Sequence, residues 1–112
     1  MGRNVMDGAE EATGTTLMVV DALDHPHGGR ILRTRVTEGV PPSVRSLRGA
    51  MLEATSPEGT RVTVKMLGFP VFGGRPSDSR IRETGRVDLL VVSVPPNGPS
   101  PGLGWELRAS AT

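Results

Sequence analysis

Residues 61–67, RVTVKML, form the segment that decides the fold of this chain. Its valines and its methionine alternate with polar side chains, and a period of two is typical of a β-strand with one buried face. The turn-forming residues 56–59, SPEG, come directly before it, and a weaker strand-like segment precedes the turn at residues 47–55. Together these segments predict a β-hairpin.

Further strand-like segments lie on both sides of this hairpin. They are residues 15–22 (TTLMVVDA), residues 30–38 (RILRTRVTE) and residues 86–94 (RVDLLVVSV). The last is apolar enough to predict a strand that is buried on both faces. Residues 75–84 predict a polar loop, and no segment has a helical period of adequate length. We therefore expect an all-β fold, a small antiparallel β-barrel of six or seven short strands.

The chain divides into three parts. Residues 1–14 predict a flexible N-terminal tail, and residues 15–94 predict the β-barrel domain. Residues 95–112 predict a loop rich in proline and glycine, after which Leu103, Trp105 and Leu107 alternate as a closing strand would. The sequence has no cysteine and no apolar run near the roughly 20 residues of a membrane span. These features predict a soluble cytoplasmic protein without a membrane partner, and they leave its oligomeric state open.

The charges are unevenly distributed, although the net charge is only +1. Residues 30–86 hold eleven basic side chains against five acidic ones, whereas residues 1–29 hold one against five. All the basic residues except Lys65 are arginines, whose planar guanidinium groups suit bidentate contact with phosphate or carboxylate. A GC-rich genome gives arginine-rich sequences as well. The composition therefore indicates a basic central segment without identifying its partner.

Laid end to end, the strands resemble the second domain of translational GTPases, the β-barrel module of elongation factor Tu and its relatives. The resemblance covers roughly residues 16–94. It is carried by GRILRTRVTEGV at residues 29–40, PEG at 57–59, LGF at 67–69 and TG at 84–85. No G-x-x-x-x-G-K-[ST] motif occurs, so the resemblance implies a free-standing barrel without the GTPase. In that family the domain contacts RNA, the ribosome or a neighbouring domain.

Basic side chains are the candidate site residues. Arg33 and Arg35 share one strand face, and Arg61 and Lys65 share another, so the four form one basic stripe if their strands are neighbours. The residues expected to bind nucleic acid are Arg30, Arg33, Arg35, Arg61, Lys65 and Arg86. In the loop after residue 74, Arg75, Arg80 and Arg82 could extend this set, whereas Asp78 and Glu83 reduce the net positive charge there. The alternative is that these charges are only the solvated outer faces of strands.

The sequence contains no recognisable catalytic motif, and it predicts neither an enzyme nor a cofactor. It has no G-x-S-x-G elbow, and the spacing of Asp21, Asp24, His25 and His27 fits no familiar zinc site. The leading hypothesis is a non-catalytic module that binds RNA or a ribosome-associated partner. One alternative is a protein-protein interaction domain with a dedicated partner. Another is a barrel that binds a small ligand in a cavity lined by Met18, Met51 and Met66.

Overall fold

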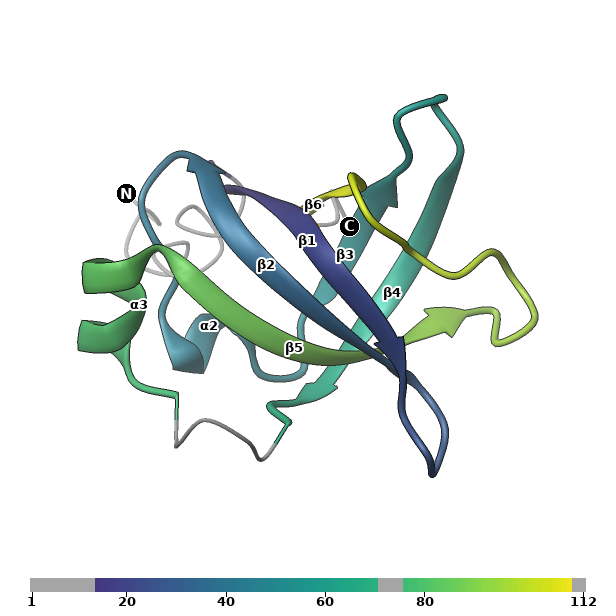
Figure 1. The fold of residues 1–112 in the computed structure, drawn as a ribbon, viewed down its shortest axis with the longest axis horizontal. Coiled ribbons are helices and arrows are strands. Elements are labelled where there is room, and N and C mark those ends of the chain that lie inside the picture. The colour runs from purple at the N-terminus through teal and green to yellow at the C-terminus, as the bar shows by residue number, and fades with distance from the viewer. Residues whose placement is uncertain (1–13, 71–75, 110–112) are drawn as a thin grey trace, which may run out of the picture.

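The strands pair edge to edge until the sheet closes on itself, which confirms the expected antiparallel β-barrel (Figure 1). This computed structural model describes residues 14–70 and 76–109 of the protein. Within them the strands are β1 (Thr16–Asp24), β2 (Arg30–Glu38), β3 (Met51–Thr55), β4 (Arg61–Gly68), β5 (Arg86–Val94) and β6 (Glu106–Ala109). Their order around the barrel is β1-β2-β5-β4-β3-β6, and β6 pairs with β1 to close it.

The strongest strand signals in the sequence are confirmed. β2 and β5 have the predicted bounds, and β3 and β4 form the predicted hairpin, in which Leu52 faces Val64. The sequence predicts a closing strand on Leu103, Trp105 and Leu107. β6 does close the barrel, but it begins at Glu106, so only Leu107 of the three belongs to it. Of the predicted tail, residues 1–14, only Gly14 lies within the described residues.

The predicted polar loop at residues 75–84 is wrong for most of its length, because Asp78–Thr84 forms helix α3. The Ser77 side chain caps this helix by accepting a hydrogen bond from the Arg80 backbone N–H, and Gly85 ends it at a φ of 67°. Ile81 is buried against the barrel. One apolar residue in two turns gives too little periodicity to be recognised in the sequence, and Arg75 lies outside the described residues.

The first half of the predicted strand at residues 47–55 is also wrong. The helical turn α2 (Val44–Leu47), with Ser43 as its N-cap, ends at the first residue of that strand, residues 48–49 form a turn, and β3 begins only at Met51. Between them Gly49 has a φ of 77°, which turns the chain away from a strand conformation. The sequence has no helical period of adequate length, yet two short helices form, each stabilised by a serine cap rather than by a long apolar face.

Aliphatic side chains from every strand fill the barrel. The buried core includes Leu32, Val64, Met66, Leu89 and Leu107. β5 alternates between buried and half-buried residues, so the expectation of a strand buried on both faces is wrong. The outer side chains of β5 instead form part of the surface described below.

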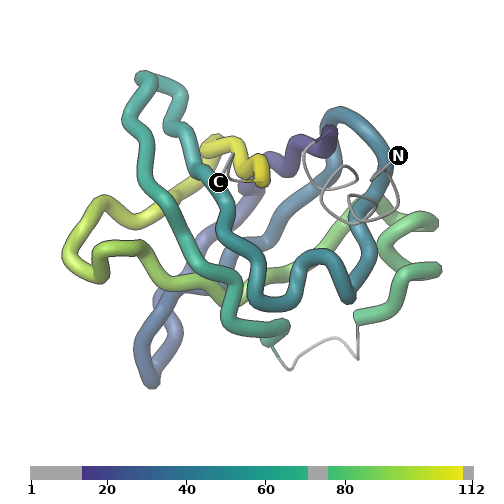
Figure 2. Tube along the Cα trace, turned by 180° about the vertical axis from the view of Figure 1, so that it is seen from behind, coloured from purple at the N-terminus to yellow at the C-terminus, as the bar shows by residue number. Residues whose placement is uncertain are grey.

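The two ends of the barrel are closed differently. Leu47 of α2 and Ile81 of α3 are buried at one end, where the Val44 backbone N–H donates to the Asp78 carboxylate at 2.7 Å. Away from these helices, the segment between β5 and β6 loops outward and returns to β6, and its Pro101 is fully buried (Figure 2). Neither described helix is long and apolar enough to span a bilayer. Figure 1 shows α3 and the β1–β2 hairpin at opposite ends of the long strands.

Candidate functional site

A groove of about 690 Å³ runs over the outer face of β1, β2 and β5 and is bounded by α3. Its charged lining residues are Asp21, Arg33, Arg35, Arg80, Arg86 and Asp88, and we call it the arginine groove. Four arginines against two aspartates leave it with a net positive charge. Val20, Phe69 and Pro70 add apolar surface at its margin. The volume lies in the range of roughly 300–1,000 Å³ that is usual for ligand-binding pockets.

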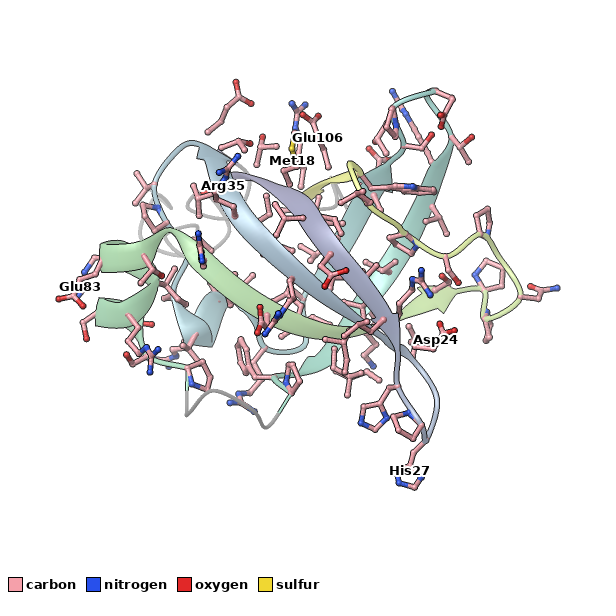
Figure 3. All side chains as sticks on the ribbon, in the orientation of Figure 1. Met18, Asp24, His27, Arg35, Glu83 and Glu106 are labelled. Atoms are coloured by element: carbon pink, nitrogen blue, oxygen red, sulfur yellow. The ribbon has the colours of Figure 1, made fainter. Side chains whose placement is uncertain are left out.

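Two arginines stand directly opposite each other in this groove. Arg35 of β2 is the cross-strand partner of Arg86 of β5, so their side chains leave the sheet on the same face. Among the described residues, neither side chain has an ion-pair or hydrogen-bond partner. On the other side of Arg35 the partner is Met18 of β1, which is not charged (Figure 3). This pair concentrates positive charge that the fold itself does not neutralise.

Two residues before Arg35 on β2, the positive charge of Arg33 has acidic neighbours on both sides. Arg33 lies between Asp21 of β1 and Asp88 of β5, its two cross-strand partners, and its Nε is 3.7 Å from the Asp88 carboxylate. A β-bulge at Val20 places both Val20 and Asp21 on the outer face. The Asp21 carboxylate also accepts a hydrogen bond from the Ala22 backbone N–H. Arg33 therefore helps to order the groove and has less charge to offer a ligand than Arg35.

Helix α3 supplies the side wall of the groove. Arg80, Ile81 and Thr84 line it from the helix, and Ser77 lines it from the capping position. The Arg80 side chain has no partner among the described residues, as with Arg35 and Arg86. Glu83 points away from the barrel on the far side of the helix, so it does not cancel the positive charge inside the groove (Figure 3).

Arg30, a predicted site residue, is bound within the protein. Its guanidinium group pairs with Asp24 at 2.5 Å and donates to the Pro101 carbonyl oxygen at 2.6 Å. These bonds attach the segment between β5 and β6 to the β1–β2 hairpin. Arg30 therefore has a structural role in the barrel.

Arg61 and Lys65 do not join the other predicted residues. They lie on β4, and β5 separates β4 from β2, so the condition for one basic stripe is not met. Lys65 faces Met51 and Val92 across its two pairings, and Arg61 faces Thr55. Of the six predicted residues, the structure brings together Arg33, Arg35 and Arg86 in the arginine groove.

Sequence reasoning missed several residues of the groove. The sequence predicts that Arg80 lies in a polar loop of mixed charge. In the structure it lies on helix α3, which is capped by Ser77 and ended by Gly85, and it lines the wall of the groove. The serine three residues before Arg80 and the glycine after Thr84 were the available signals. Asp21 and Asp88 had no signal of their own, because their role depends on β1 and β5 lying on either side of β2.

The structure also bears on the two other sites considered from the sequence, a metal site near His25 and a cavity lined by methionines. No group of three potential metal ligands converges within residues 14–70 and 76–109. In the β1–β2 turn, the His25 Nδ1 accepts the His27 backbone N–H instead. The methionine-lined cavity is not formed either, because Met66 lies in the core while Met51 is exposed and Met18 half-buried on the outer face.

Comparison with known proteins adds nothing to this geometry. No protein-family model, curated protein or solved structure matches the chain. A closed six-stranded barrel is compatible with many functions, so the fold alone carries no functional conclusion. The case for a function rests on the side chains of the arginine groove.

Proposed function

We propose that this protein is a non-catalytic binding module that contacts RNA, or a ribosome-associated partner, through the arginine groove. The observation that carries the proposal is the set Arg35, Arg80 and Arg86, which lines one groove without a partner among the described residues. A folded protein gains little from holding Arg35 opposite Arg86, because like charges directly across a sheet repel each other. An external anion would relieve that repulsion.

Phosphate is the anion that this arrangement suits best. Guanidinium groups form charge-assisted, bidentate hydrogen bonds with phosphate oxygens, and several arginines along one groove can contact successive phosphates of a nucleic acid. Phe69 lines the groove, but the Arg48 guanidinium already lies over its ring, 5.3 Å from the centroid, so base stacking is not part of the proposal. The binding we propose is therefore mainly electrostatic, with little dependence on base sequence. The resemblance to a translation-factor barrel and the expected cytoplasmic location fit this proposal.

The test compares two double variants that each remove two positive charges. Arg35→Ala/Arg86→Ala should weaken binding to a labelled RNA hairpin at low salt by about tenfold. The slope of log K against log salt concentration should also fall by about 1.5, since two phosphate contacts are lost. Arg61→Ala/Lys65→Ala, on β4, should change the affinity by less than about twofold.

Two results would end the proposal. If the purified protein binds neither the hairpin nor ribosomes at low salt, the RNA hypothesis should be dropped. If both double variants weaken binding equally, the affinity comes from net charge and the groove is not the site. Circular dichroism and thermal melts of each variant would check that the barrel is intact.

A protein partner is a second candidate, favoured by apolar side chains on the outer face. Leu23 of β1 is 45% exposed and Leu67 of β4 is 47% exposed. Ile31, only 6% exposed, and the half-buried Leu90 follow Leu23 in one cross-strand row, which ends at Gly68 beside Leu67. A stoichiometric protein complex that resists nuclease and is lost in Leu23→Asp/Leu67→Asp would favour this candidate over RNA.

A further inference from the structure

We propose that the arginine groove is also the docking site for an acidic segment of this chain, residues 7–11, and that this segment competes with RNA for Arg35 and Arg86. The inference goes beyond the proposed function, because docking of the segment can be measured without RNA. It rests on the unneutralised charge in the groove, on the place where the chain enters the barrel and on the composition of the preceding residues.

The segment has the complementary charge. Asp7, Glu10 and Glu11 lie within five residues, DGAEE, and no basic residue lies among them. Carboxylates are, with phosphates, the groups that a guanidinium binds bidentately. A carboxylate of this segment therefore offers Arg35 and Arg86 the same kind of contact that we propose for a phosphate.

The chain enters the barrel beside the end of β2 that carries Arg35. The Thr15 hydroxyl donates to the Val40 carbonyl oxygen at 2.5 Å, and Thr16 is the partner of Glu38. Gly39 packs so closely on Gly14 that an added Cβ would overlap the Gly14 carbonyl oxygen. Gly14 is therefore fixed at this end of the barrel, and Met18, two residues after Thr16, is already the partner of Arg35.

The length of chain is sufficient to reach the groove. Four residues separate Gly14 from Met18, which is about 13 Å of strand. Glu10 comes four residues before Gly14 in the sequence, and four extended residues span at most about 14 Å, so its maximum reach from Gly14 matches the distance to Met18. Arg35 lies beside Met18, and Arg86 lies beyond Arg35. Both arginines are then within reach of Glu10 and Glu11.

Nearby acidic side chains leave these arginines available. Glu38, the acidic residue closest to the chain entry on β2, accepts from the Thr16 hydroxyl and pairs with Arg108 at 3.5 Å. Glu106 lies 3.9 Å from the same guanidinium. The carboxylates of Glu38 and Glu106 therefore both pair with Arg108 of β6. Arg35 and Arg86 have no acidic partner among the described residues.

The direct test uses the full chain and the side-chain N–H signals of its arginines in nuclear magnetic resonance. Glu10→Gln/Glu11→Gln should shift the Nε–Hε signals of Arg35 and Arg86. The matched control is Glu53→Gln/Glu58→Gln, which removes the same charge from the β3–β4 hairpin and should leave those signals unchanged. The difference in these signals between Glu10→Gln/Glu11→Gln and the unchanged protein should vanish at about 0.5 M salt, where the Debye length falls to about 4 Å.

RNA binding gives a second readout. An intramolecular segment has an effective concentration in the millimolar range, so a weak contact of this kind should compete measurably. Glu10→Gln/Glu11→Gln should then raise RNA affinity at low salt about two- to fivefold, more than the control does.

The outcomes separate the two proposals. Arginine signals that do not move in Glu10→Gln/Glu11→Gln, or that move equally in the control, overturn the docking. An equal gain in RNA affinity from both variants also counts against it, because net charge then explains the gain. Shifted arginine signals in a protein that binds no RNA would leave the docking standing and remove the proposed function.

Discussion

The two ends of β2 carry the same type of side chain in opposite situations. At one end Arg30 is held by Asp24 and by the Pro101 carbonyl oxygen. At the other end Arg35 faces Arg86 and has no partner among the described residues. Figure 3 shows Asp24 and Arg35 at these opposite ends. Both arginines look alike in the sequence, so their difference comes entirely from the strands and loops that surround them.

The difference indicates how charge on a small barrel divides between stability and binding. Where a guanidinium finds a carboxylate and a buried carbonyl oxygen, it fixes a loop and is unavailable to a ligand. Where the opposite strand presents a second guanidinium, the charge is left for an external anion. Neither net charge nor strand periodicity distinguishes these two cases, because both depend on which strands are neighbours.

The largest effect on stability should come from the Arg30 end. Arg30→Ala removes the contacts to Asp24 and to the Pro101 carbonyl oxygen, and it should lower the free energy of unfolding by about 1.5 kcal/mol. RNA affinity should change little. Denaturant unfolding of Arg30→Ala and Arg35→Ala side by side measures the contrast. Equal stability of the two variants would show that the two ends do not differ as the contacts indicate.

A smaller effect of opposite sign should come from the Arg35 end. Arg35→Glu replaces a repulsive cross-strand pair with an attractive one, Glu opposite Arg86, and should raise the free energy of unfolding by about 0.5 kcal/mol. The same substitution should abolish RNA binding at the groove. The free energy of unfolding and the RNA affinity should be measured on the same preparation of Arg35→Glu. Together they test whether a substitution here raises stability while it lowers binding. A destabilised variant would contradict the proposed repulsion between Arg35 and Arg86.

The sequence predicted the barrel because strand periodicity is a local property. The alternation in residues 61–67 and the bounds of β2 and β5 follow from side chains within each segment. The site was harder to predict, since placing Arg86 rather than Lys65 beside Arg35 requires the strand order β2-β5-β4. Arg80 was missed for another reason: α3 is a short helix defined by its caps, which a search for apolar periodicity does not detect.

Arg33, near the middle of β2, offers the finest test of the comparison, because it combines features of Arg30 and of Arg35. It lies in the arginine groove as Arg35 does, but Asp88 holds its Nε at 3.7 Å, and the two side chains are 47% and 31% exposed. Asp88→Asn removes that pairing with little change in shape. Since exposed ion pairs contribute little, the free energy of unfolding should fall by less than about 0.5 kcal/mol.

RNA affinity should respond more clearly to Asp88→Asn than stability does. The groove loses a negative charge, so affinity at low salt should rise about twofold and the salt dependence should steepen. Glu58→Gln, in the turn before β4, removes the same charge outside the groove and is the control. If the two variants gain equally, the gain comes from net charge, and Asp88 has no particular influence on binding at the groove.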